Sequence, residues 1–156
     1  LDVLAEEGFF YDASINPAVL ARFGVPDFPA QPVRLECRDG RGLVELPVAT
    51  WKAFGRRFPV AGGGYHRLLP FPFIRHAIEK TVLAGDAFVA YCHPYEFDPD
   101  EFDHLAHRVP LKMRLHQGLG RRGVEAKFRQ MLREFETTLA IQLAERQEWP
   151  AHVLVG

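Results

Sequence analysis

The segment AFVAYC, Ala87–Cys92, constrains the fold of this chain more than any other stretch of the sequence. It is apolar at every position and stops abruptly at His93 and Pro94, after which acidic residues recur. A run that is apolar on both faces is typical of a strand in a parallel sheet whose two faces are both covered. An amphipathic helix over roughly residues 73–83 precedes it, so we predict an α/β fold with parallel strands.

The rest of the chain carries the signals of further helices and strands. Apolar residues at helical spacing predict helices, and short apolar runs bounded by Gly and Pro predict strands. Three consecutive glycines predict a tight turn, and Thr50 is suited to cap a short helix. The predicted elements are an opening helix over 1–8, a strand over 9–15 that ends at Asp12, a strand over 42–48 limited by Pro47, a short helix over 50–54, a turn at 62–64 and a long helix over 122–148.

The composition restricts the size of the protein and its class of partner. With 156 residues, of which 47% are hydrophobic, the chain can bury one sizeable core and forms one domain or part of one. A formal net charge of -1 gives no electrostatic reason to expect nucleic acid or an anionic membrane as partner. No apolar run reaches the roughly 18 residues of a membrane span. Cys37 and Cys92 fit neither a disulfide framework nor a zinc-binding spacing.

The first residues predict that the chain is part of a longer protein. Leu1, Leu4 and Ala5 share one face of the opening helix, and Gly8 is suited to end it. No N-cap residue or first turn precedes Leu1, so this helix starts midway. We therefore expect the chain to be a C-terminal portion.

Two polar, titratable residues stand where predicted strands end. In sheets of parallel strands, ligands bind at the carboxyl ends of the strands. His93 and Asp12 lie at such ends and are therefore candidate site residues. In the alternative interpretation each of them caps a loop, and the pattern alone leaves both open.

Three longer segments carry a resemblance to one family. YDASINPAVLARFGVPDFP, GLVELPVATWKAFGRRFPVAGGGYHRLLP and AFVAYCHPYEFDPD are together similar to the C-terminal half of NodB-like polysaccharide deacetylases, in the branch linked to bacterial exopolysaccharide gene clusters. The resemblance extends from Leu1 to about Phe135. Its most specific pieces are AGGGYxRLLP and the strand end xHPxExDP.

The resemblance implies a fold, a reaction and a role for His93. The family folds into a distorted (β/α) barrel and uses a divalent metal, such as zinc, to remove N-acetyl or O-acetyl groups from sugars. His93 then occupies the place of the histidine that protonates the leaving amine, and Asp12 that of an acidic residue that orients or charges it. Tyr91 stands where the family has leucine. The family's metal ligands and catalytic base lie on earlier strands that are absent here, so we expect the chain alone to be inactive.

Four further side chains are candidates for binding a polysaccharide or oligosaccharide substrate. Aromatic rings stack on sugars, and a guanidinium donates to hydroxyl or acetyl oxygens. The candidates are Tyr65, Tyr95, Trp51 and Arg67. In the alternative interpretation the rings pack between helix and sheet, and the arginine pairs with Glu45 or Glu96.

Other reactive side chains favour structural roles. Cys92 would point to the opposite face of a strand from the histidine beside it, which predicts core packing. His104 and His107 match no common metal-ligand spacing and are predicted to lie on a helix surface. The carboxylates after the predicted strand could bind a hard cation, but Asp98 or Asp100 is better suited to cap a helix.

Two classes of function remain. The first is a deacetylase acting on an amino-sugar polysaccharide, with residues 1–112 forming part of the barrel and 113–156 a helical extension. The second is a non-catalytic module of the same fold that binds carbohydrate or assembles a partner. The apolar stripe of the long helix could cover the barrel or join two copies of the chain. Its members are Met131, Phe135, Leu139 and Leu143.

Overall fold

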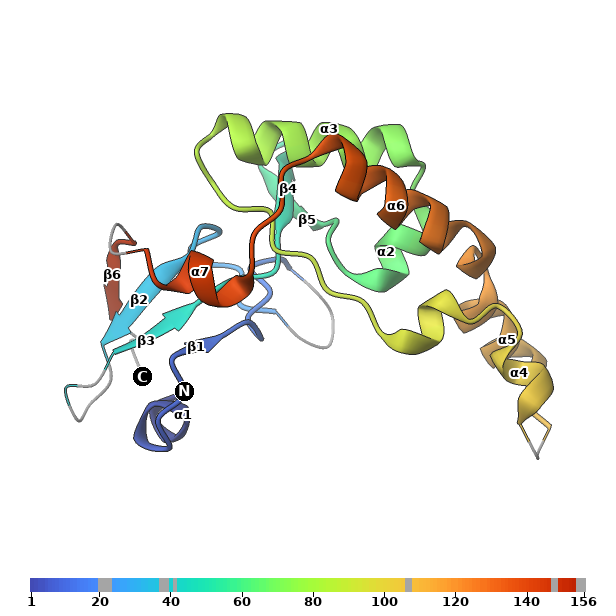
Figure 1. The fold of residues 1–156 in the computed structure, drawn as a ribbon, viewed down its shortest axis with the longest axis horizontal. Coiled ribbons are helices and arrows are strands. Elements are labelled where there is room, and N and C mark those ends of the chain that lie inside the picture. Colours follow the sequence, from blue (N-terminus) through green and yellow to red (C-terminus); the bar gives the residue numbers. More distant parts are fainter. Residues whose placement is uncertain (20–23, 37–39, 41, 106–107, 147–148, 154–156) are drawn as a thin grey trace.

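The structure, a computed structural model, is a mixed α/β arrangement of a four-stranded sheet, a separate hairpin and several helices (Figure 1). It describes residues 1–19, 24–36, 40, 42–105, 108–146 and 149–153. The strands are β1 (Tyr11–Asp12), β2 (Val33–Glu36), β3 (Gly42–Glu45), β4 (Thr50–Ala53), β5 (Arg56–Pro59) and β6 (Ala151–Val153). The helices are α1 (Asp2–Glu6), α2 (Gly63–Leu68), α3 (Phe71–Leu83), α4 (Glu101–His104), α5 (Leu111–Gly118), α6 (Val124–Glu134) and α7 (Ala140–Ala144), with 3-10 turns η1 (Pro94–Phe97) and η2 (Arg121–Gly123).

The four-stranded sheet is mixed, whereas the sequence predicts parallel strands. Its order is β1-β3-β2-β6, in which β1 runs parallel to β3 and β6 parallel to β2, while β2 and β3 are antiparallel. Asp12 pairs with Glu45 across β1 and β3. The prediction that the first strand ends at Asp12 is confirmed.

The first strand is shorter than the predicted range 9–15 because a side chain interrupts its ladder. The chain continues beside β3, with the Leu46 N–H donating to the Asp12 carbonyl at 2.8 Å and the Val48 N–H to the Ile15 carbonyl at 2.9 Å. Between these bonds, the Ile15 N–H donates to a carboxylate oxygen of Glu45 at 2.9 Å. A side chain thus takes the place of a backbone acceptor.

Helices cover both faces of β3. Successive strand residues point to opposite faces, and Ala5 of α1 packs on Leu43 while Leu143 and Ala144 of α7 pack on Val44. Figure 1 shows α1 and α7 on opposite sides of the sheet. Two of the small core clusters thus lie on opposite sides of β3, and two more lie around Leu35 of β2 and around Ala49 and Ala61.

The segment Ala87–Cys92 is not a strand in this structure, so that prediction is wrong. It is extended, but only two backbone bonds tie it to its neighbours: the Ala49 N–H donates to the Val89 carbonyl at 2.9 Å, and the Tyr91 N–H donates to the Ala61 carbonyl at 3.0 Å. No described strand runs beside its full length, and two isolated bonds do not make a ladder. It crosses instead between the sheet and the helices (Figure 1).

The predicted long helix over 122–148 is two helices, α6 and α7, joined by an extended segment. Phe135 ends α6 in an extended conformation. The side-chain oxygen of Gln142 then accepts from the Thr138 hydroxyl at 2.9 Å and from the Leu139 N–H at 3.4 Å, so α7 begins with a new cap. Since the apolar stripe is divided between two helices, it does not form one continuous seam.

Two other predicted helices are confirmed. The helix over 73–83 is confirmed as α3 and ends before Gly85, which has a φ of 81°. The opening helix is confirmed as α1, with Gly8 just beyond its end. The three glycines do not form an isolated turn, because Gly63 begins α2. Within the described part of the chain, no helix is long and apolar enough to cross a membrane.

Residues 50–54 form strand β4 and its turn, and the predicted short helix is wrong. The hairpin β4–β5 pairs Trp51 with Phe58 and closes between Ala53 and Arg56. Trp51 also packs edge-on against Phe73 of α3 at 4.8 Å. This tertiary packing of a large aromatic ring favours the strand over the local helical signal.

The two turn residues of the hairpin, Phe54 and Gly55, have φ values of 50° and 72°. Two-residue hairpin turns with positive φ at both positions favour Asn-Gly or Asp-Gly. A phenylalanine in the left-handed region is strained by about 1 kcal/mol or more.

We expect Phe54→Asn to raise the free energy of unfolding by about 1 kcal/mol, because asparagine tolerates the left-handed conformation and the ring makes no buried contact that would be lost. Phe54 is 97% exposed. Urea unfolding monitored by circular dichroism measures the change. A loss of stability would contradict the strained turn.

Candidate functional site

His93 lies where the extended segment 86–93 meets η1. Its side chain is 55% exposed, so the imidazole is open to solvent and to a ligand. Pro94 starts η1 directly after it, which fixes the direction in which the chain leaves. The sequence predicts that this histidine ends a strand, which is wrong, because the segment before it is extended but is not a strand.

Two tyrosine rings contact this histidine. The Tyr95 ring stacks on the His93 ring with centroids 5.2 Å apart and an interplanar angle of 19°. The Tyr91 ring meets the His93 ring edge-on at 5.7 Å. Burial, Glu96, Tyr65 and Tyr95 together raise the pKa of Tyr91, so its phenol stays protonated at neutral pH. Of the predicted sugar-binding residues, Tyr95 thus lies against His93, and Tyr65 lies near Tyr91.

A buried carboxylate, that of Glu96, lies behind the histidine. Glu96 is 1% exposed, and its Oε2 accepts from the His93 N–H at 3.0 Å. Its Oε1 lies 3.9 Å from Nδ1 of His93 and 3.8 Å from Nε of Arg67. The carboxylate therefore lies between one buried cation and one exposed imidazole. Its bond to the His93 N–H fixes the start of η1.

The glycine motif makes room for these groups. A Cβ at Gly63 would overlap the Glu96 carboxylate, and one at Gly62 would lie 2.9 Å from the Tyr91 hydroxyl oxygen. Gly64 is different, because its Cβ would meet only an Arg67 nitrogen at 3.7 Å, an ordinary contact. The two motifs AGGGYxRLLP and xHPxExDP are therefore two sides of one packed unit.

Arg67 is held inside the protein, 7% exposed. Its Nη1 donates to the backbone carbonyls of His116, Gln117 and Leu119 at the end of α5. The structure thus shows the alternative in which Arg67 pairs with Glu96, and its guanidinium is turned away from any surface ligand.

Two further cations, Lys127 and Arg121, join the helices near the site. Lys127 of α6 donates to the carbonyls of His66, Arg67 and Leu69 at the end of α2, with distances from 2.8 to 3.1 Å. The side chain of Arg121 is fully buried, and its Nη1 donates to Glu101 Oε2 at 2.7 Å. Its guanidinium also lies 4.9 Å from the centre of the Tyr95 ring and so supports the ring that stacks on the imidazole.

Asp12 is placed elsewhere. Its carboxylate accepts from the Ser14 hydroxyl at 2.5 Å, and its strand partner is Glu45. Burial raises the pKa of Glu45 to about 7, and the nearby Asp12 adds to the rise, although the Ile15 N–H opposes it. The carboxylate that the structure brings to His93 is Glu96, whereas Asp12 forms an acidic pair with Glu45.

The remaining candidates lie away from His93 or serve packing. Trp51 packs against α3 and the hairpin partner strand. Burial and then Glu96 raise the pKa of the Cys92 thiol, which disfavours a nucleophilic thiolate. His104 is exposed on α4, as predicted for a surface histidine. Asp100 occupies the N-cap position of α4. Cys37 and His107 lie outside the described residues.

The described residues do not offer a site for the metal that the family resemblance implies. Nowhere in the described ranges do three His, Cys, Asp or Glu side chains converge in a way that could hold a metal ion. The donors around His93 are a single imidazole, a carboxylate already shared with Arg67, and phenols. This chemistry suits proton transfer and ring stacking rather than metal ligation.

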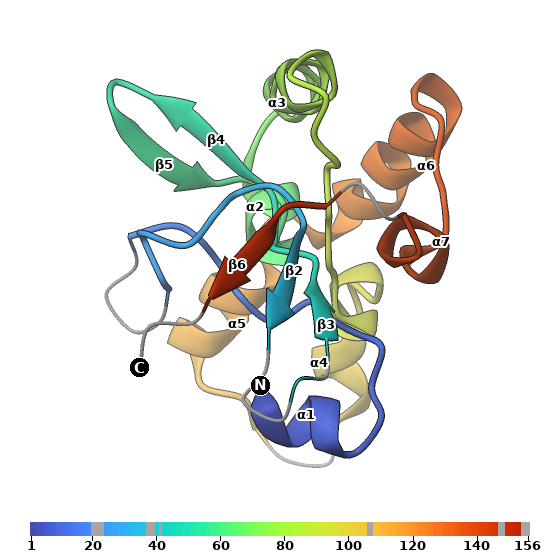
Figure 2. The same cartoon turned by 90° about the vertical axis from the view of Figure 1, so that its left-hand side faces the viewer.

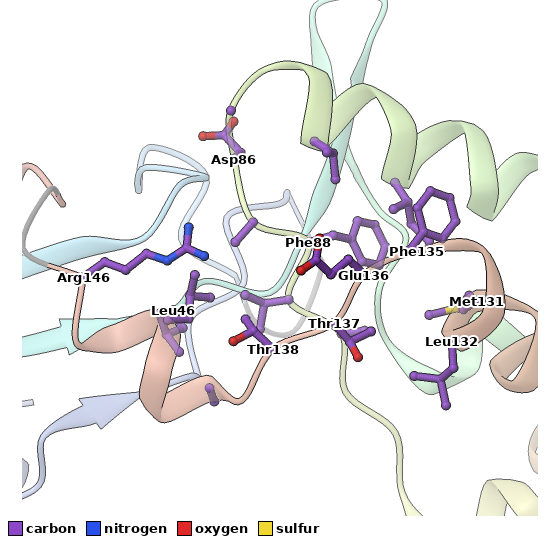
Figure 3. A pocket seen from close by; sticks show the side chains of 18 of the residues that line it. Leu46, Asp86, Phe88, Met131, Leu132, Phe135, Glu136, Thr137, Thr138 and Arg146 are labelled. Atoms are coloured by element: carbon purple, nitrogen blue, oxygen red, sulfur yellow. The ribbon is translucent and has the colours of Figure 1, made fainter.

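A large cavity lies apart from His93. It has a volume of about 450 Å³, is partly open to solvent and lies between α3, α6, α7 and the segment 85–90, and Figure 3 shows Phe88, Phe135 and Met131 among its lining side chains. Asp86, Glu136 and Arg146 are the charged residues that line it. Since the lining is mostly apolar, the cavity lacks a set of groups for acid-base chemistry.

Sequence reasoning missed the roles of Glu45, Arg121 and Lys127. Arg121 and Lys127 lie in charged segments, and no local pattern marks them as bonded to distant carbonyls. Glu45 lies within a predicted strand, and no local pattern marks its carboxylate as the acceptor for the Ile15 N–H. For Glu96 a signal exists, since a carboxylate three residues after a helix cap can accept the cap residue's N–H.

The family model described as "Domain of unknown function (DUF3473)" matches residues 13–144. The chain belongs to this family. Neither a curated protein nor a solved structure matches the chain. The matched range of this DUF3473 domain includes His93, Glu96 and the glycine motif, so the packed unit at the site lies within the family's part of the chain.

We expect Gly63→Ala to destabilise the DUF3473 domain by about 3 kcal/mol or more, because the new methyl group would displace the buried Glu96 from Arg67. The matched control is Gly64→Ala in the same helix, which should be neutral or stabilise by up to about 1 kcal/mol. Urea unfolding of both variants checks the contrast. Equal effects would contradict the close packing of Gly63 on Glu96.

We expect Glu45→Gln to change how stability depends on pH. In the wild type the unfolded chain releases the Glu45 proton near pH 4.5, whereas the folded protein holds it to about pH 7, so the free energy of unfolding falls across this range. The predicted loss is about 3 kcal/mol. Glutamine keeps the acceptor for the Ile15 N–H and has no proton to lose.

The measurement is urea unfolding of both proteins at pH 5 and pH 8, and the variant should gain stability relative to the wild type as the pH rises. Buried His66, with its pKa lowered to about 4 by burial and then Lys127, produces the opposite slope, but it is common to both proteins and cancels. A difference between the proteins that is the same at both pH values would rule out a protonated Glu45.

Proposed function

We propose that this domain supplies the general acid of a metal-dependent deacetylase that removes acetyl groups, foremost N-acetyl groups, from an amino-sugar polysaccharide. The observation that carries the proposal is the exposed His93 imidazole, stacked on Tyr95 and backed by the buried Glu96 carboxylate. The resemblance to NodB-like deacetylases supports it, as does the association of DUF3473 domains with polysaccharide deacetylase-like proteins.

In this proposal His93 acts at the second step of amide hydrolysis. Once water has added to the acetyl carbonyl, the carbon-nitrogen bond breaks and the amine leaves as it receives a proton from the imidazole. Histidine titrates near neutral pH and can deliver that proton. Glu96 Oε1 lies 3.9 Å from Nδ1 and can orient the imidazole for the transfer.

The neighbouring side chains position the substrate in this proposal. Tyr91, 41% exposed, offers apolar surface beside the imidazole, where a sugar ring can stack, whereas the Tyr95 ring stacks on the imidazole and holds it in place. Arg67 keeps the Glu96 carboxylate in place from within and does not contact the sugar. The Arg121 guanidinium lies 4.9 Å from the centre of the Tyr95 ring and supports that ring.

The barrel and the metal belong to the same proposal. The divalent metal ion, its ligands and the base that deprotonates the water would come from a part of the protein outside this chain, together with the strands that complete a (β/α) barrel. The open extended segment 86–93 would then find a neighbouring strand.

A second candidate is a non-catalytic module that binds carbohydrate. The cluster of Tyr91, His93 and Tyr95 rings favours it, because such a surface binds a sugar without any proton transfer. The two candidates differ in whether the imidazole is needed for turnover or only for contact.

We expect His93→Ala in the full-length protein to lower deacetylation of an N-acetylated amino-sugar oligomer by about 100-fold or more, because the leaving amine loses its proton donor. Metal content should stay at the wild-type value, since His93 is not a ligand. Release of acetate and elemental analysis of the purified protein measure the two quantities.

The matched control is His104→Ala, which removes an exposed histidine from α4 and should leave turnover unchanged. Unchanged turnover in His93→Ala would refute the general-acid role. A wild-type protein that binds the oligomer with its metal site filled but releases no acetate would favour the non-catalytic module.

A further inference from the structure

The hairpin β4–β5 projects from the body of the protein. Figure 2 shows its turn at the end farthest from the helices and the four-stranded sheet. Phe54 occupies this tip and is 97% exposed, so its ring makes almost no contact with the rest of the described chain. The most exposed large apolar side chain among the described residues is therefore also carried at an outermost point of the fold.

Folding does not account for this ring. The turn places Phe54 at a φ of 50°, where asparagine or glycine would be favoured. No core cluster includes it. A strained, exposed aromatic residue at a protruding tip indicates contact with something outside the chain.

The charges beside the ring indicate the chemistry of the partner. The hairpin residues 50–59 include Lys52, Arg56 and Arg57 and no carboxylate. Lys52 and Arg57 lie directly opposite each other on the paired strands, where like charges repel. In the described structure none of the three cations forms an ion pair.

A third element extends this basic surface. Lys80 of α3 lines a hollow of about 290 Å³ together with Lys52 and Arg57, and Asp86 is the one carboxylate that lines it. The chain as a whole has a net charge of -1, so the positive field is local to this hairpin and its hollow. The overall charge gives no reason to expect an anionic partner and does not reveal this local positive surface.

We propose that the hairpin β4–β5 docks the protein on an anionic lipid surface, with Phe54 entering the headgroup region and Lys52, Arg56 and Arg57 contacting lipid phosphates. An exposed apolar tip with cationic flanks matches the way peripheral proteins bind such surfaces. An acidic polysaccharide would also attract the cations, but it would leave the apolar ring at the tip without a partner. The proposal is independent of the deacetylase reaction.

The test is flotation of the protein with phosphatidylcholine vesicles that do or do not contain phosphatidylglycerol, at low and high salt. We expect binding only to the anionic vesicles, and weaker binding at high salt. Replacing one cation, as in Arg56→Gln, should lower the partition coefficient about fivefold. Phe54→Asn should lower it roughly tenfold or more.

The controls separate binding from folding. Phe54→Asn is expected to be more stable than the wild type, so its loss of binding cannot reflect unfolding. Leu83→Ser removes another apolar side chain, 80% exposed at the end of α3, and Arg133→Gln removes an exposed cation of α6. Both should bind as the wild type does.

Three outcomes would overturn the proposal. The first is equal binding to vesicles with and without phosphatidylglycerol, or binding to neither. The second is binding that Phe54→Asn and Arg56→Gln leave unchanged. The third is retention of the protein by a uronic acid polymer, and not by anionic vesicles, at the same ionic strength.

Discussion

The buried carboxylate of Glu96 is the group on which the arrangement of the helices depends. Burying a carboxylate is costly unless it is paired and hydrogen-bonded, and here the partners are the Arg67 guanidinium and the His93 N–H. The close approach is possible only because Gly63 has no side chain. Arg67 in turn binds carbonyls at the end of α5, so one ion pair joins the glycine motif, the histidine turn and a helix about fifty residues further on.

The apolar contacts are distributed differently from these polar ones. The sheet is covered by α1 and α7 in small clusters around β3, while a mostly apolar cavity of about 450 Å³ separates α3 and α6 from it. Residues 86–90 of the extended segment line this cavity, and few backbone bonds tie the segment to its neighbours. The part of the fold that presents His93 is thus held mainly by buried ion pairs and hydrogen bonds, which are directional and fix geometry more closely than apolar contact does.

Charge acts at two scales in this protein. The net charge is close to zero, and most acidic and basic side chains lie on surfaces where pairs contribute little. Against this background Arg67, Arg121 and Glu96 are buried and organise the site. In the hairpin, Lys52 and Arg56 are exposed and Arg57 is half-buried, and none of the three forms an ion pair in the described structure. A partner would therefore sense the local arrangement of charge rather than the total.

The sequence by itself determined the α/β class, the positions of α1 and α3 and the end of the first strand at Asp12, because helix stops, turn residues and short apolar runs are local signals. Tertiary structure alone decided that Glu96 rather than Asp12 lies beside His93, that Trp51 belongs to a hairpin, and that the terminal helix breaks after Glu134. These outcomes depend on groups distant in sequence. The Glu96 carboxylate can be buried because a cation distant in sequence, Arg67, pairs with it and because Gly63 has no side chain in its place. No local sequence pattern indicates that these groups meet.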